Sequence, residues 1–165
     1  METNKQKANM AAKEELREQG IDPNEQQAPE KFYRQPLSFV RRGDRLTGRR
    51  LAAWEQYSPT HVLDLPRLLT DTSVAPEAEF DAEKIYGRTA PLVVEIGSGL
   101  GEAMVHRAAE LPDTNFLAVE VYTPGIADLL RKMAAEGVEN VRVAQANAPE
   151  LLDNMFEENS IDELW

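Results

Sequence analysis

Residues 93–101 read Val-Val-Glu-Ile-Gly-Ser-Gly-Leu-Gly, and this stretch decides the fold. Two β-branched residues lead into an acidic residue, Glu95, which is followed by three glycines at alternate positions, Gly97, Gly99 and Gly101. The pattern predicts a buried strand that ends in a loop almost without side chains. Because glycine adopts positive φ without strain, such a backbone can lie directly against a ligand.

The spacing of these glycines separates two classes of ligand. Loops that bind dinucleotides place the third glycine three residues after the second, as G-x-G-x-x-G. Here the third glycine comes two residues after the second, and Glu102 stands where the last glycine or alanine would be. The E-x-G-x-G-x-G form instead resembles motif I of the class I S-adenosylmethionine (SAM) methyltransferases. A glycine-rich turn could also be only a tight connection between strand and helix. The segments that follow are therefore needed to decide between these two interpretations.

Two further strand signals end in polar residues. The run at 115–121 contains Glu120, 19 residues after Gly101, and an acidic residue about 20 residues past such glycines binds a ribose hydroxyl in doubly wound folds. The alternative for Glu120 is a solvated strand end. The run at 140–146 leads to Asn147, whose amide can pair with the edge of an adenine or cap the following helix.

Helical spacing of apolar residues separates the strand signals. It predicts helices after Gly101, over 126–133 and over 151–156, and a fourth strand opens at 161–165. Alternating strands and helices predict a doubly wound, Rossmann-like α/β fold, with a parallel sheet and helices on both faces. The methyltransferase resemblance implies the strand order 3-2-1-4, which would place the fourth strand in the middle of a larger sheet.

Composition narrows the class of protein. The chain of 165 residues has no cysteine, and its two histidines, His61 and His106, lie far apart in sequence. We therefore expect neither disulfides nor a metal site. A long apolar run and a secretory leader are both absent from the sequence, so we expect a cytoplasmic protein without a membrane span.

The charge is uneven along the chain. The net charge is −11, but residues 1–50 carry +3 and residues 51–165 carry −14. The positive part includes an arginine-rich segment, which comprises Arg41, Arg42, Arg45, Arg49 and Arg50. Arginine binds phosphate in a bidentate manner and stacks on bases, so this segment predicts contacts with RNA; a solvated run of charges is the alternative.

Four regions follow from these patterns. Residues 1–35 are polar and predicted to be disordered. Residues 36–70 form an arginine-rich N-terminal region, and residues 71–90 are predicted to be an acidic surface insertion. Residues 91–165 correspond to the N-terminal half of a SAM-binding methyltransferase domain.

Together these segments resemble the bacterial tRNA (guanine-N7-)-methyltransferases. The resemblance rests on residues 38–48, 94–101, 111–121 and 140–147, and the most specific part is Pro-Asp-Thr-Asn-Phe-Leu-Ala-Val-Glu-Val within the third. It implies SAM-dependent methylation of N7 of a variable-loop guanosine in tRNA, with tRNA as partner and SAM as cofactor. The residues that it assigns to SAM are Glu95, Gly97, Gly99, Gly101, Glu120 and Asn147.

The chain departs from this family in two places. Asn147 stands where the family usually has Asp, which keeps an acceptor and removes a charge. The family also continues the strand at 161–165 into a Pro-Asp-Pro-Trp motif that carries the catalytic Asp. Because the chain ends at Trp165, we expect no catalytic residue within it, and we expect an incomplete form with little activity alone.

Other functions stay open at this point. The chain could be a non-catalytic SAM- or RNA-binding module, or a SAM methyltransferase with a small-molecule or protein substrate. An NAD-dependent dehydrogenase is disfavoured by the glycine spacing. The sequence leaves open whether the protein is a monomer or a homodimer.

Overall fold

The computed structural model describes residues 45–165, and the structural statements below concern these residues. Their helices and strands follow in chain order: α2 (Gly48–His61), α3 (Ala82–Tyr86), β1 (Leu92–Ile96), α4 (Glu102–Glu110), β2 (Asn115–Glu120), α5 (Thr123–Glu136), β3 (Val141–Gln145), α6 (Ala148–Met155) and β4 (Glu163–Leu164). From β1 onward strands and helices alternate as predicted. Arg41, Arg42 and the predicted disordered region 1–35 lie outside the described residues.

The strands form one parallel sheet in the order β3-β2-β1-β4. β1 pairs with both β2 and β4, so that Val94 lies opposite Leu117 on one side and Leu164 on the other. The buried run of β2 has the continuous apolar character of a parallel strand covered on both faces. The predicted doubly wound α/β fold is confirmed.

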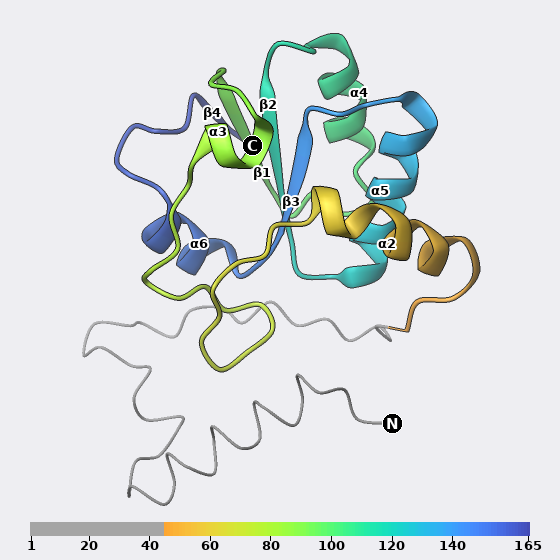
Figure 1. Cartoon of the computed structure of the whole chain (residues 1–165), viewed down its shortest axis with the longest axis horizontal. Coiled ribbons are helices and arrows are strands. Elements are labelled where there is room, and N and C mark those ends of the chain that lie inside the picture. Colours follow the sequence, from red (N-terminus) through yellow and green to blue (C-terminus); the bar gives the residue numbers. More distant parts are fainter. Residues whose placement is uncertain (1–44) are drawn as a thin grey trace, which may run out of the picture. The chain divides into compact units, whose positions relative to one another are not determined.

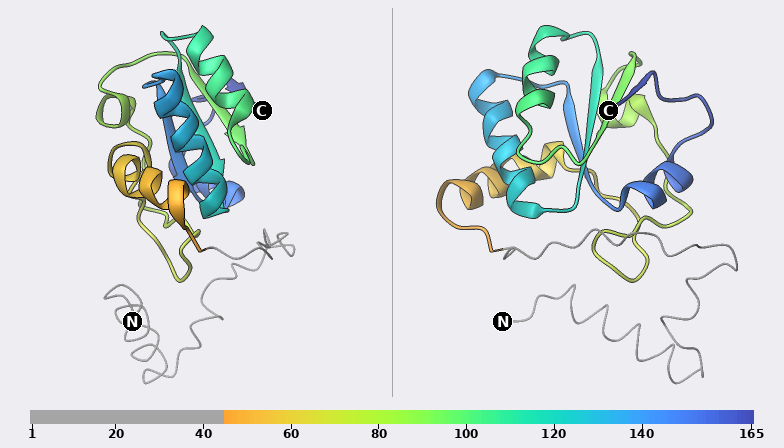
Figure 2. Two further views of the ribbon diagram at one scale, coloured as in Figure 1. Left: turned by 90° about the vertical axis from the view of Figure 1, so that its right-hand side faces the viewer. Right: turned by 180° about the vertical axis from the view of Figure 1, so that it is seen from behind.

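Alternate residues of the strands face two separate layers of core. Val93, Phe116 and Ala118 pack with residues of α4 and α5, and the aromatic side chains of α2 join this layer. Val94, Leu117 and Val119 pack with α6 and with the chain before β1. Figure 1 shows this division, with α2, α4 and α5 on one side of the sheet and α3 and α6 on the other, and the views in Figure 2 agree.

Helix α2 was not predicted from the sequence, because the run of arginines dominated that part of the chain. It packs against α5, where Arg50 Nη2 lies 2.6 Å from Asp128 Oδ2. After α2 the chain runs along β3, and Leu63 N donates to Val143 O at 2.8 Å. The outer strand of the sheet is thus partly covered, which limits pairing with other chains.

Part of the segment 71–90, which was predicted to be an acidic surface insertion, lies in the core. Val74 and Ala75 are completely buried. Two residues of α6 hold this turn, since Glu150 Oε2 accepts from Val74 N at 2.9 Å and Asn154 Nδ2 donates to Val74 O at 2.8 Å. The abundant acidic residues of the segment hid a short apolar stretch that belongs to the core.

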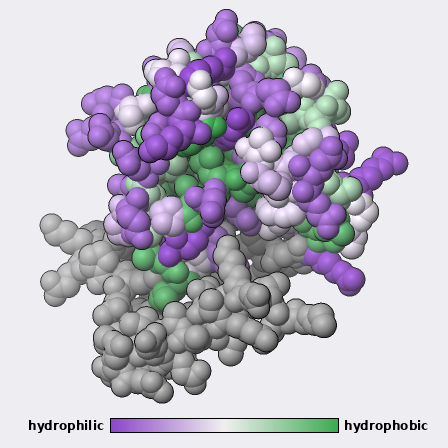
Figure 3. All heavy atoms as spheres, in the orientation of Figure 1, coloured by the Kyte–Doolittle hydropathy of each residue, from purple (hydrophilic) through white to green (hydrophobic). Residues whose placement is uncertain are grey.

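The surface of the described part is largely polar. On the face drawn in Figure 3, hydrophilic residues surround a narrower hydrophobic area. Within residues 45–165 there is no helix with the length and apolar character needed to cross a membrane.

Candidate functional site

The loop after β1 contains two kinds of glycine. Gly97, Gly99 and Gly101 have φ of +73°, +57° and +77°, so all three adopt the left-handed conformation that favours glycine. A Cβ at Gly97 would meet no atom within 4 Å, and one at Gly99 would meet only Gly97 O at 3.9 Å. A Cβ at Gly101 would lie 2.5 Å from Leu129 Cγ. The first two glycines therefore border open space where a ligand can approach, and the third is required for packing against α5.

Gly125, in the first turn of α5, is a further glycine of the site that sequence reasoning missed. A Cβ at this position would lie 2.6 Å from Gly99 O, a backbone atom of the loop. The absence of a side chain lets the start of α5 touch the glycine loop. A signal was available in the sequence, because glycine beside Pro124 is unfavourable inside a helix unless close approach requires it.

Glu120 ends β2 and holds the glycine loop. Its Oε2 accepts from Gly99 N at 2.8 Å. Its Oε1 accepts from Val121 N at 2.8 Å and from Tyr122 N at 3.0 Å. A carboxylate has about four acceptor sites, so capacity remains for a ligand hydroxyl. The structure therefore gives Glu120 a structural role beside the predicted ribose contact, and it is not merely a solvated strand end.

Glu95 lies near the end of β1 with an unsatisfied oxygen. Its Oε2 is buried and has no hydrogen-bond partner among the described residues. Burial raises the pKa of this carboxyl above its usual value. Buried acceptors without donors are rare in folded proteins, and they often mark a place where an absent group belongs. A cationic or N–H-bearing ligand group would satisfy this oxygen.

Asn147 takes the N-cap position of α6, but its side chain makes no cap hydrogen bond. Its Nδ2 donates to Glu150 Oε1 over a long 3.4 Å. Its backbone N donates to Thr72 O at 2.7 Å, which ties the chain before β1 to this corner of the sheet. The side chain of Asn147 therefore does not cap α6, although capping was the alternative to a ligand contact.

A cavity of about 90 Å³ lies at the carboxyl ends of β1, β2 and β3. Its lining residues are Ile96, Gly97, Val119, Glu120, Val121, Ala146 and Ala148. The fold therefore brings Gly97 and Glu120 together, as predicted, and the alanines on either side of Asn147 complete the wall. Typical ligand pockets measure roughly 300 Å³ or more, so a ligand seated here would extend over the open glycine loop.

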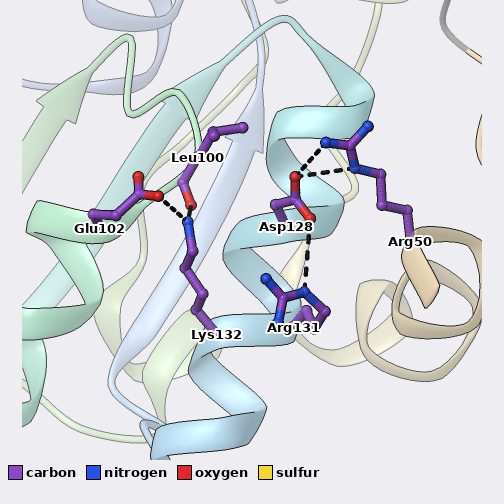
Figure 4. A network of polar contacts seen from close by, with 6 residues as sticks. All are labelled: Arg50, Leu100, Glu102, Asp128, Arg131 and Lys132. Atoms are coloured by element: carbon purple, nitrogen blue, oxygen red, sulfur yellow. Dashed lines mark hydrogen bonds and ion pairs between the residues drawn. The ribbon is translucent and has the colours of Figure 1, made fainter.

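Ion pairs connect this loop, through α5, to the arginine-rich segment (Figure 4). Lys132 of α5 donates to Leu100 O at 2.6 Å and forms an ion pair with Glu102. One turn earlier, Asp128 accepts from Arg50 Nη2 at 2.6 Å. The hydrogen bond from Arg50 lowers the pKa of Asp128.

The structure places the predicted RNA-binding arginines only in part. Arg45, three residues before α2, and Arg49, in its first turn, are both exposed. Arg50 is engaged with Asp128, although 45% of its side-chain surface remains accessible. Arg41 and Arg42 lie outside the described residues. The described residues contain no group of three or more potential metal-ligating side chains of the His, Cys, Asp and Glu types.

The fold, the open glycine loop and the acidic strand ends define the class of protein. Residues 89–165 match the family model described as a putative methyltransferase. These residues therefore form part of an α/β methyltransferase domain.

Comparison with curated proteins gives the particular family. The tRNA (guanine-N(7)-)-methyltransferase of Paenarthrobacter aurescens is 52% identical over 145 residues, which is 88% of this chain and 48% of that protein. Proteins of the same name from Cutibacterium acnes and Pseudomonas fluorescens are 43% and 35% identical, over 78% and 90% of this chain and 47% and 58% of their own lengths. The predicted resemblance to tRNA (guanine-N7-)-methyltransferases is confirmed, and the chain spans about half the length of the curated relatives it matches.

Proposed function

We propose that this chain carries the SAM-binding site of a tRNA (guanine-N7-)-methyltransferase. The observation that carries the proposal is the pairing of an open glycine loop with Glu120, whose carboxylate accepts from Gly99 N at 2.8 Å. The names of the related proteins support the activity and the tRNA substrate.

Three polar side chains would bind different parts of SAM. Glu120 would accept from a ribose hydroxyl through its remaining acceptor site. Asn147 would accept from the adenine amino group, since its side chain is not used as a helix cap. Glu95 would accept from the cationic amino group, which would satisfy its buried Oε2. Gly97 and Gly99 would let the backbone approach the ligand without a steric barrier.

The chemistry of the proposed reaction demands placement more than proton transfer. Bound SAM supplies a methyl group on a positively charged sulfur. Guanine N7 has an in-plane lone pair and no proton, so the chain needs no general base to expose the nucleophile. What the described residues contribute is a fixed orientation of the methyl donor, which favours in-line attack.

The exposed arginines at and just before the start of α2 would contact the tRNA backbone. Arg45 and Arg49 are exposed, and guanidinium groups bind phosphates in a bidentate manner. Such contacts make affinity fall with salt concentration. Replacing both residues by alanine should weaken tRNA binding and reduce its salt dependence, and SAM affinity should stay unchanged. Unchanged tRNA binding in the double variant would contradict this part of the proposal.

The first test of the proposal is calorimetric titration of the chain with SAM. Wild-type chain should bind, and Glu120→Ala should weaken binding by about tenfold or more, because hydrogen bonds to a charged group are among the strong ones. The matched control is Glu157→Ala, which removes an exposed carboxylate after the end of α6. Absence of SAM binding by chain that circular dichroism shows to be folded would overturn the proposal.

A further inference from the structure

Lys132 contacts the glycine loop although it lies outside the sequence motifs that predicted the site. Its ammonium group donates to the carbonyl oxygen of Leu100 at 2.6 Å, and it also forms an ion pair with Glu102, the first residue of α4. Figure 4 shows the side chain reaching from α5 to both partners. Lys132 thus joins α5 to the turn that leads from the loop into α4.

The Leu100 carbonyl belongs to a part of the loop where the backbone has unusual conformational freedom. Its residue stands between Gly99 and Gly101, the two glycines on either side that have positive φ. Leu100 is 42% exposed and so contributes little packing. Glycine leaves the adjoining peptide groups free to rotate. A hydrogen bond to this carbonyl therefore restricts the motion that the sequence itself permits.

Other contacts hold the loop at different points. Glu120 fixes Gly99 N from the side of β2, and Gly101 packs on Leu129 of α5. The peptide group after Leu100 is held on its N–H side, where Gly101 N donates to Ser98 O at 2.9 Å. Lys132 adds a restraint on the carbonyl side of this peptide, from the same helix that provides Leu129.

The ion pair with Glu102 keeps the ammonium group in place. The side chain of Lys132 is 20% exposed and that of Glu102 is 67% exposed. The hydrogen bond from Lys132 is the largest cause of the lowered pKa of Glu102. Glu102 also lies in the first turn of α4, where a negative charge is favourable. The two contacts have separate tasks: Glu102 holds Lys132, and Lys132 orients the loop.

We propose that Lys132 is a positioning residue for SAM, which sets the affinity of the cofactor by fixing the Leu100 peptide of the glycine loop. This inference rests on the proposed SAM site. It adds to that site a residue that touches the loop rather than the ligand.

The test compares Lys132→Met, Lys132→Arg and Glu102→Gln in the 165-residue chain by calorimetric titration with SAM. We expect Lys132→Met to bind SAM about fivefold to tenfold more weakly, which corresponds to the loss of one charge-assisted hydrogen bond. Lys132→Arg should restore most of the affinity, because its guanidinium can donate to the same carbonyl. Glu102→Gln leaves the hydrogen bond from Lys132 to Leu100 O in place. The affinity for SAM should therefore change by less than about twofold.

A second measurement separates loop positioning from general stability. Amide hydrogen exchange in ligand-free protein should quicken at residues 97–102 in Lys132→Met and stay unchanged in the strands. The matched control is Lys84→Met, which removes an exposed lysine paired with Asp81 before α3. It should alter neither the exchange of the loop nor the affinity for SAM.

The outcomes distinguish this inference from the proposed function. If wild-type chain binds SAM and Lys132→Met binds it equally well, the positioning role is wrong and the SAM site stands. If Lys132→Met lowers the melting temperature without any change in affinity or loop exchange, the role is structural and the inference is again overturned. If folded wild-type chain does not bind SAM, the proposed function and this inference fail together.

Discussion

The two ends of the parallel sheet differ in how their polar groups are satisfied. At the amino end, Arg88 donates to Asn115 Oδ1 at 2.9 Å and to Pro112 O at 2.8 Å. Asn140 Nδ2 serves three backbone carbonyls in the same region. At the carboxyl end, Glu95 has a buried oxygen with no partner among the described residues, and Gly97 borders open space.

Cavity volume alone would favour the amino end over the proposed site. The amino end has a cavity of about 390 Å³, lined in part by Arg88 and Asn140, and the carboxyl end has one of about 90 Å³. The polar groups around the larger cavity mostly serve backbone carbonyls, with Asn115 Nδ2 as a neutral exception. The proposed site therefore rests on unused hydrogen-bonding capacity and bare backbone instead of empty volume, in keeping with the rule that ligands bind at the carboxyl ends of strands.

The largest expected effect comes from Gly125→Ala at the carboxyl end. The new Cβ would lie 2.6 Å from Gly99 O, so α5 or the glycine loop must move. We expect SAM binding to fall below detection in calorimetry, because overpacking against backbone costs roughly 1–3 kcal/mol and displaces the loop as well. The measurement is a titration of folded variant with SAM.

The control for this prediction is Gly137→Ala at the amino end. Gly137 also has positive φ, +66°, but a Cβ there would meet no atom within 4 Å. The variant should lose about 1 kcal/mol of stability at the end of α5 and keep its affinity for SAM. Equal loss of SAM binding in both variants would remove the distinction between the two ends.

Arg88→Ala tests the amino end with a smaller effect. The substitution leaves Asn115 Oδ1 and the carbonyls of Pro112 and Thr114 without the guanidinium donor. We expect the free energy of unfolding to fall by about 2–3 kcal/mol in urea denaturation. Affinity for SAM, measured well below the unfolding transition, should not change. A selective loss of SAM binding at full stability would show that the amino end takes part in the site.

The sequence predicted the backbone arrangement at the carboxyl end because local chemistry determines its conformation. In the loop after β1, the residues with positive φ are glycines. The acidic residue at the end of β2 follows them at the spacing that is typical of the doubly wound fold. The sequence could therefore predict that Gly97 and Glu120 lie close together, and the structure brings them to one cavity. The parallel strands could also be predicted, because they are continuous apolar runs in the sequence.

What the sequence did not reveal depends on contacts between distant segments. Gly125 and Lys132 touch the loop only because α5 folds back across it. Helix α2 and the buried turn at Val74 were missed since charged neighbours masked their few apolar residues. The pairing of Arg50 with Asp128, 78 positions apart, has no local signature in the sequence.

Glu95→Gln sharpens the comparison through pH. Burial raises the pKa of Glu95 in the folded chain, so the folded state holds its proton more tightly than the unfolded state does. Stability from this group is present below the ordinary pKa of Glu and is lost as pH rises through the raised value. Ligand-free Glu95→Gln should therefore be more stable than wild type at neutral pH, by at most about 1 kcal/mol because the side chain is only partly buried.

The advantage of Glu95→Gln should vanish in acid, where both side chains are neutral. Thermal unfolding at a series of pH values checks this, and SAM titration of the same variant should show weaker binding. Greater stability with weaker binding is the signature of a carboxylate kept for a ligand. A variant that is less stable than wild type at neutral pH would instead mean that the carboxylate has a structural partner.

Asn147→Asp has the smallest expected effect and tests the departure from the family's usual residue. An Asp keeps an oxygen acceptor at this position, so the proposed adenine contact persists. The negative charge is favoured at the N-terminus of α6 by about 0.3–1 kcal/mol. Against this, the variant loses the 3.4 Å hydrogen bond to Glu150 Oε1 and places two carboxylates together.

Because these terms oppose each other, the affinity of Asn147→Asp for SAM should differ from that of wild type by less than about threefold. Asn147→Leu, which removes the acceptor and keeps a similar volume, should weaken binding more than Asn147→Asp in the same titration. Glu150 also accepts from Val74 N, so repulsion between the carboxylates would appear first as lower stability of the turn at Val74. If Asp and Leu weakened binding equally, the acceptor at residue 147 would not contact the ligand.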